Sequence, residues 1–97
     1  MAPDTPPLIV GNWKMQGDTT TWEALATDIA HSVVRRGLHR QVEVVLCPPL
    51  LGLAAASAAL AAAQAAGKVL LGAQNCYGVK QGAYTGEVSP FMLADAG

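Results

Sequence analysis

Charged residues are scarce in this chain of 97 residues. Only 13% are Asp, Glu, Lys or Arg, against about 25% in an average soluble domain. Six basic and seven acidic residues give a net charge of −1, so there is no basic surface for nucleic acid or anionic lipid. Because 52% of the residues are hydrophobic, disorder is excluded as well. The composition indicates one folded domain that binds neither nucleic acid nor a membrane surface.

Cysteine is also rare. Cys47 and Cys76 form no Cys-x-x-Cys pair and have no histidine at zinc-ligand spacing, so we predict reduced thiols and no metal site. The residues before Leu8 include no basic residue and no apolar stretch, which argues against a secretory signal. The predicted compartment is the cytoplasm.

No apolar run is long enough to cross a bilayer. The segment 44–67 lacks charge, but Pro48-Pro49 interrupts it and its remainder is mostly alanine. Alanine is too weakly apolar for a span of about 20 residues. We therefore expect this segment to form a helix of a soluble domain and not a membrane span.

What the chain does contain is an alternation of strand and helix patterns. The β-branched run 8–10 predicts a strand. From Trp22 onward, apolar residues recur with helical spacing, and Gly37 is a typical stop. Thr20 and Glu23 have the spacing of a capping box, which predicts a helix start at this point.

The same unit repeats twice. We predict a strand at 42–47, an alanine-rich helix at 50–66, a third strand at 69–75, a glycine-rich loop at 76–87, and a third helix that starts at Ser89-Pro90. Apolar strands alternating with helices are typical of a parallel sheet covered on both faces. The predicted fold is α/β with three parallel βα units over 8–97, preceded by a flexible leader at 1–7.

The first strand ends in Gly11-Asn12-Trp13-Lys14-Met15. Neither the dinucleotide-binding glycine pattern nor a P-loop is present. If the extended conformation continues past the strand, Asn12 and Lys14 project to the same side as Leu8 and Val10. That arrangement would put an amide and an ammonium at the strand ends, where parallel βα folds build their sites. The alternative is that Lys14 is an ordinary solvated lysine.

Four segments together resemble the triosephosphate isomerase family: Gly11–Met15, Cys47-Pro48-Pro49, Gly72–Tyr77 and Gly82–Pro90. The resemblance implies a partial TIM (β/α)8 barrel. It also implies the interconversion of dihydroxyacetone phosphate and glyceraldehyde 3-phosphate, a step of glycolysis and gluconeogenesis, without cofactor or metal.

Residue roles follow from the same resemblance. Lys14 resembles the active-site lysine that meets the phosphate and the developing oxyanion, and Asn12 resembles the asparagine that orients the substrate and that lysine. Both are expected to be catalytic and substrate-binding residues. Thr85 resembles the threonine at the tip of a loop that crosses a dimer interface, although a simple turn hydroxyl is the alternative.

The expected interface residues are Met15, Gln16, Thr85 and Glu87. The family pattern usually has Asn at the position of Gln16. Glu87 has no geometric argument for a role as a base, and its place in the third loop favours a surface or interface carboxylate.

The resemblance implies that a fourth strand carries a histidine electrophile and that a glutamate base follows later, and this chain ends at Gly97, ahead of both. About 250 residues are typical of a complete barrel. His31 and His39 are expected at the surface. One ammonium contributes about 4 kcal/mol at an effective dielectric near 20, whereas enzymes lower barriers by roughly 8 to 23 kcal/mol. The chain alone is therefore expected to be inactive.

Two non-enzymatic functions remain open. Three strands without the rest of a barrel leave apolar side chains uncovered, each worth about 1.5 to 3 kcal/mol when buried. The chain could be a non-catalytic structural unit that self-associates as a homo-oligomer or pairs with a complementing barrel fragment. It could also be a weak phosphate-binding module that uses Lys14.

Overall fold

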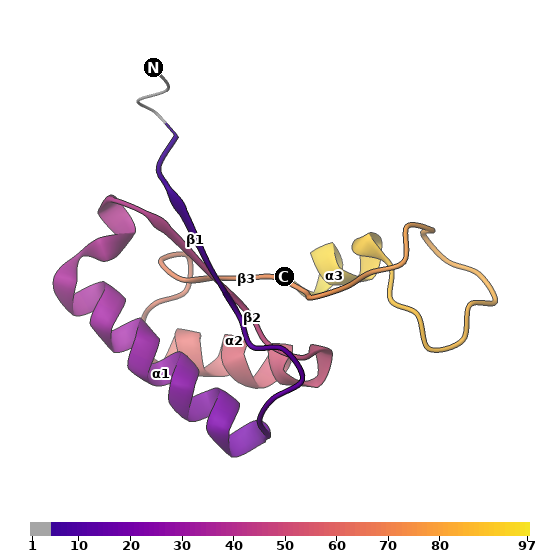
Figure 1. Ribbon diagram of the computed structural model, residues 1–97, viewed down its shortest axis with the longest axis horizontal. Coiled ribbons are helices and arrows are strands. Elements are labelled where there is room, and N and C mark those ends of the chain that lie inside the picture. Colours follow the sequence, from indigo (N-terminus) through magenta and orange to yellow (C-terminus); the bar gives the residue numbers. More distant parts are fainter. Residues whose placement is uncertain (1–4) are drawn as a thin grey trace.

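The computed structural model describes residues 5–97 and confirms the predicted alternation of strands and helices (Figure 1). Of the leader expected at 1–7, residues 1–4 lie outside this description. The elements are β1 Leu8–Asn12, α1 Thr19–Arg36, the 3-10 turn η1 Leu38–Arg40, β2 Glu43–Cys47, the 3-10 turn η2 Leu50–Gly52, α2 Leu53–Ala62, β3 Leu70–Leu71 and α3 Pro90–Ala96.

The three strands form one parallel sheet in the order β1-β2-β3. Val10 of β1 pairs with Val45, which in turn pairs with Leu70 of β3. The ladder already begins at Pro7, whose carbonyl accepts a hydrogen bond of 2.9 Å from the Glu43 N–H. Because all strands run the same way, their carboxyl ends share one edge of the sheet. The sheet is open, with β1 and β3 as its edges.

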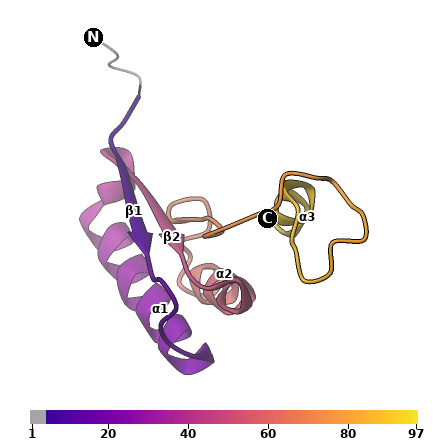
Figure 2. The ribbon, with the colours of Figure 1, turned by 45° about the vertical axis from the view of Figure 1, so that its right-hand side comes forward.

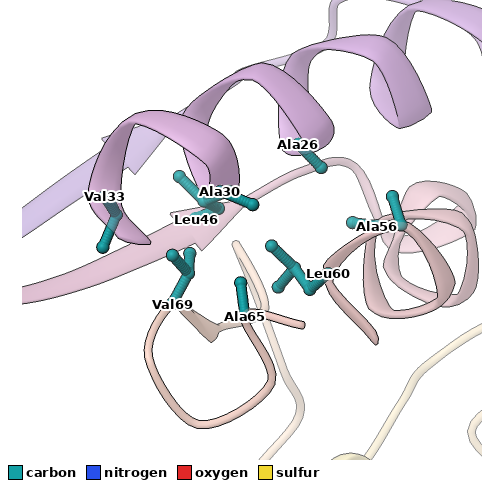
Figure 3. Packing of buried hydrophobic residues seen from close by; sticks show 9 residues of the cluster. Ala26, Ala30, Val33, Leu46, Ala56, Leu60, Ala65 and Val69 are labelled. Carbon is teal, nitrogen blue, oxygen red and sulfur yellow. The ribbon is translucent and has the colours of Figure 1, made fainter. Parts of the chain in front are cut away.

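A small, alanine-rich core joins one face of the sheet to α1 and α2 (Figure 3). Five of its nine buried residues are alanines, which allow the two helices to pack closely together and against Leu46. The buried set is Ala26, Ala30, Val33, Leu46, Ala56, Ala59, Leu60, Ala65 and Val69. On this face, the sheet is therefore held to α1 and α2 mainly by contacts between methyl groups.

Within residues 5–97, no helix covers the opposite face of the sheet, so the expectation that helices would cover both faces is wrong. Side chains alternate along a strand, and Leu46 faces the helices, so its neighbour Val45 points to the other side. The register puts Leu8, Val10 and Leu70 on that side too. Their exposed fractions are 58%, 52% and 39%. We call Leu8, Val10, Val45, Cys47 and Leu70 the open face.

The start of α1 differs from the predicted capping box. The N-cap is Asp18, whose Oδ1 accepts a hydrogen bond of 2.9 Å from the Thr21 N–H. The Thr21 hydroxyl oxygen accepts one of 2.8 Å from the Asp18 N–H. A threonine thus fills the role of the Glu or Gln in the usual box. Thr20 and Glu23 lie inside the helix, so their predicted capping role is wrong.

Two elements are shorter than predicted. Helix α2 ends at Ala62, because Gln64 adopts a φ of +56° that no α-helix accommodates. The start of the predicted helix, Leu50–Gly52, is a 3-10 turn. Strand β3 has two residues only, since beyond Leu71 the last ladder bond is the 3.0 Å one from the Gly72 N–H to the Leu46 carbonyl. The predicted strand 69–75 is therefore mostly loop.

Helix α3 begins where the sequence predicts. The Ser89 hydroxyl accepts a hydrogen bond of 3.1 Å from the Met92 N–H, and Pro90 occupies the first turn. The helix and the long loop before it stand apart from α1 and α2 in both ribbon views (Figure 2). No helix within residues 5–97 has the length and apolar character that a membrane crossing requires.

Candidate functional site

The site begins where β1 ends. The Oδ1 atom of Asn12 accepts a hydrogen bond of 2.9 Å from the Lys14 N–H. Lys14 has a φ of +56°, a backbone conformation that non-glycine residues rarely adopt. A short side chain that bonds to the backbone two residues on is the usual way to stabilise such a turn. Asn12 and Lys14 are therefore directly coupled, as part of one tight turn.

The coupling differs from the one expected from alternation along a strand. That argument required the extended conformation to continue to Lys14, whereas β1 ends at Asn12 and the chain turns. The parity argument is therefore wrong. The two residues are neighbours at the sheet edge because of a turn and a side-chain hydrogen bond.

A second polar side chain reaches this turn from the segment that follows β3, at the opposite edge of the sheet. The Nε2 atom of Gln74 donates hydrogen bonds of 2.8 Å to the carbonyl of Lys14 and of 2.8 Å to the carbonyl of Cys47. Gln74 follows β3, Cys47 ends β2 and Lys14 follows β1. One amide thus links the carboxyl ends of all three strands.

Sequence reasoning placed Gln74 within the third strand and gave it no role. A usable signal was present, because a long uncharged polar side chain stands where a parallel strand should end in a shared edge. Its partners could not have been read from the sequence, since both are main-chain carbonyls distant in the chain.

The remainder of the first loop is anchored by Trp22. Its Nε1–H donates a hydrogen bond of 2.8 Å to the Gln16 carbonyl. Gly17, at a φ of +96°, lies so close to the indole that an added Cβ would be 2.6 Å from Nε1. Met15, by contrast, is 94% exposed. The loop is fixed through its backbone, while the side chain of Met15 is free to meet another surface.

The long loop between β3 and α3 is organised around two tyrosines whose rings contact each other at an interplanar angle of 45°. The rings of Tyr77 and Tyr84 are 4.7 Å apart between centroids, and the Tyr77 N–H donates a hydrogen bond of 2.7 Å to the Val88 carbonyl. Thr85 and Glu87 are exposed on this loop. The loop starts beside the β1 end, where Gln74 bonds to the Lys14 carbonyl, but its later part extends away from β1 in both ribbon views (Figures 1 and 2), so the structure does not bring Thr85 to the Lys14 turn of the same chain.

The histidines lie away from the strand ends. His31 is exposed on α1, and His39 lies in η1, in the connection that leads into the amino end of β2. Within residues 5–97, no group of three or more His, Cys, Asp and Glu side chains is placed to hold a metal ion. The site at the strand ends thus consists of an ammonium, two amides and backbone groups.

A groove of about 860 Å³ lies between α2, β3 and α3, separate from the Lys14 turn. Its lining includes Leu53, Leu71, Met92 and Leu93 and no charged side chain. Lys14 is the cation placed at the shared strand edge, so we assign the candidate site to the Lys14 turn and not to the larger apolar groove.

Three parallel βα units with a polar site at the carboxyl ends of the strands define the class of α/β proteins that includes (β/α) barrels and doubly wound sheets. The Triosephosphate isomerase family model matches residues 7–97. The chain therefore belongs to the triosephosphate isomerase family.

Curated relatives carry the same name. The chain is 48% identical over 94 residues to the triosephosphate isomerase of Chloroflexus aurantiacus, with 94% of this chain and 34% of the relative covered. Identity is 43% over 90 residues to that of Rhodopirellula baltica, covering 93% and 33%. It is 41% over 90 residues to that of Ehrlichia chaffeensis, covering 93% and 34%. The chain thus spans about a third of the length of these relatives.

Proposed function

We propose that the 97-residue chain supplies the substrate-anchoring part of a triosephosphate isomerase that works in the cytoplasm without cofactor or metal. Lys14 is the cation for the phosphate and for the oxyanion of the enediol, and Asn12 orients both Lys14 and the substrate. The observation that carries the proposal is the bond from the Lys14 N–H to the Asn12 Oδ1 at the shared strand edge. Family membership supports the substrate, a triose phosphate.

The chemistry requires a proton to leave one carbon and return to its neighbour while negative charge collects on oxygen. An ammonium stabilises that charge, because a compact cation is most effective where charge grows in the transition state. Its contribution is about 4 kcal/mol, short of the roughly 8 to 23 kcal/mol that enzymes remove. A base and a proton donor must come from other units of the barrel, so we propose that the 97 residues alone are inactive.

The same proposal includes a contact between two copies. Met15 and Gln16 in the first loop, and Thr85 and Glu87 in the long loop, are exposed in the described chain. A second copy whose long loop reaches the Lys14 turn would cover all four. We propose them as interface residues of a homodimer.

The test is a chimeric barrel in which residues 7–97 replace the matched segment of the Chloroflexus aurantiacus relative. A coupled isomerase assay should detect turnover in the chimeric barrel and none in the 97-residue chain. Lys14→Ala in the chimera should lower kcat/KM by roughly a thousandfold, the equivalent of about 4 kcal/mol. Lys68→Ala, at the opposite end of β3, is the matched control. Full activity in Lys14→Ala would overturn the proposal.

The open face favours a second candidate function. Leu8, Val10 and Leu70 are exposed on the same face of the sheet, with Val45 of β2 between Val10 and Leu70. Apolar surface of this kind promotes association, so the 97-residue chain could act as a structural unit that pairs with a second copy or with a complementing barrel fragment. Light scattering on the chain tests this: a compact monomer at all concentrations argues against it. Calorimetric titration of the 97-residue chain with a triose phosphate tests the remaining alternative, simple phosphate binding by Lys14. That alternative expects measurable affinity without turnover.

A further inference from the structure

The side chain of Gln74 reaches two carbonyls that belong to different strands. Its Nε2 atom lies 2.8 Å from the carbonyl oxygen of Lys14 and 2.8 Å from that of Cys47. The Cys47 carbonyl also accepts a hydrogen bond of 3.0 Å from the Trp13 N–H. The Cys47 carbonyl at the end of β2 therefore accepts two hydrogen bonds, one from Trp13 next to Lys14 and one from Gln74.

Only a nitrogen with two hydrogens satisfies this arrangement. Both partners are carbonyl oxygens, which accept and cannot donate, so the amide nitrogen of Gln74 must face them. A primary amide carries two N–H donors on one atom, and each is used once. A carboxylate of the same shape has no donor and would face two oxygens.

The turn that Gln74 holds is one that lysine does not adopt readily. A φ of +56° at Lys14 places its Cβ near backbone atoms, and such conformations persist only when the surroundings fix them. Asn12 holds the N–H of Lys14, at 2.9 Å, and Gln74 holds its carbonyl. Both peptide groups that flank the Lys14 Cα are thereby fixed, and with them the direction in which the side chain leaves the backbone.

We propose that Gln74 is a positioning residue for Lys14. Its amide holds the carbonyl side of the positive-φ turn, so that the ammonium is already directed before substrate binds. This inference rests on the proposed role of Lys14 as the substrate-anchoring cation. Gln74 acts through Lys14 and is not itself assigned a contact with substrate.

The backbone effect is tested on the 97-residue chain without any activity measurement. The one-bond Cα–Hα coupling in NMR spectra distinguishes positive from negative φ at Lys14. Gln74→Met keeps the length of the side chain and removes both donors, and it should shift this coupling toward the negative-φ value. Gln41→Met, the same change at an exposed position before β2, is the matched control and should leave the coupling unchanged.

Gln74→Glu provides an internal control within one molecule. The carboxylate faces two carbonyls, which raises its pKa, so the turn should be lost at neutral pH. As the pH falls below the raised pKa, the protonated carboxyl regains one donor and the positive φ should return in part. This reversible change keeps the test informative even if Gln74→Met does not fold. An unchanged Lys14 coupling in Gln74→Met, or in Gln74→Glu at every pH, overturns the inference.

The catalytic consequence is tested in the chimeric barrel. Gln74→Met should lower kcat by about tenfold, corresponding to the loss of two ordinary hydrogen bonds, and should have a smaller effect on KM. If the Lys14 coupling shifts while kcat is unchanged, Gln74 does hold the positive-φ turn, but its proposed role in positioning Lys14 for catalysis is wrong. If Lys14→Ala itself retains activity, the proposed function fails, and the NMR result still decides what Gln74 does to the turn.

Discussion

Trp22 lies directly on Gly52. A Cβ built on Gly52 would be 2.8 Å from Cδ2 of the indole and 3.2 Å from the Pro48 Cβ. The same indole donates its N–H to the Gln16 carbonyl. The first turn of α1 therefore connects the loop that carries Lys14 to the turn that follows β2.

Gly52→Ala should destabilise the chain by about 1 to 3 kcal/mol, because the added methyl group meets backbone-anchored ring atoms that cannot move freely. The φ of Gly52 is negative, at −91°, so the loss is steric and not conformational. Urea unfolding followed by tryptophan fluorescence measures it. Gly78→Ala is the control, since a Cβ there meets nothing within 4 Å. An equal loss in both variants would contradict the packing argument.

Ser89→Ala should unravel α3 locally. The Ser89 hydroxyl caps the Met92 N–H and the residue is buried, so its removal costs about 1 kcal/mol of helix stability. Because α3 stands apart from the other helices, the loss should affect α3 alone. Hydrogen exchange at Met92 is the measurement. Ser57→Ala, at an exposed position within α2, should change nothing in α3. Unaltered exchange at Met92 would rule out the cap.

Acid should weaken the start of α1. Hydrogen bonds from the Thr21 N–H and the Thr21 hydroxyl lower the pKa of Asp18 below its ordinary value of 3.8. A carboxyl whose pKa falls on folding stabilises the fold above the unfolded-state pKa, and this stabilisation is lost as the pH drops through the folded-state value. We therefore expect a loss of stability that begins near pH 4.

Asp18→Asn separates the cap from the charge. Asparagine still caps a helix, so this variant should keep α1 but lose its share of the acid dependence below pH 4. Asp28→Asn, inside α1, removes the same charge without a cap and serves as the control. Thermal unfolding followed by circular dichroism across that range gives the comparison. Identical acid profiles for the native chain and Asp18→Asn would refute the linkage.

Val10→Asp should suppress self-association. Val10 lies on the open face and is exposed, so a charge there has little effect on folding but opposes burial against another molecule. Leu51→Asp introduces the same charge at an exposed position on η2, away from the open face. Sedimentation should show smaller species for Val10→Asp only. An equal effect of both substitutions would mean that association does not use the open face.

The alternation of strands and helices could be predicted because each element carries its own local signal. Ser89 and Pro90 mark the start of α3, and the apolar spacing after Trp22 marks α1. The four segments that resemble the triosephosphate isomerase family led to the correct family for the same reason, since each is contiguous in the sequence.

The errors arose where distant residues or an unusual local backbone conformation decide the outcome. The length of β3 depends on how many backbone groups of β2 are available for pairing. The end of α2 depends on a positive φ at Gln64, which helix propensity does not predict. The link from Gln74 to Lys14 spans 60 positions, and it joins a side chain to a main-chain atom. Patterns of residue type carry no information about such a pair.

The alanine-rich core makes this chain unequally sensitive to the direction of a size change. Ala26 and Ala30 of α1 and Ala56 of α2 are fully buried, so almost nothing remains to be trimmed at these positions, whereas an added carbon pushes the two helices apart. Random mutation at these positions therefore acts mainly by swelling the core, and compensation must come from a shrinking neighbour. The small residues on these two helices can therefore change only together, because a larger residue on one helix requires a smaller one on the other.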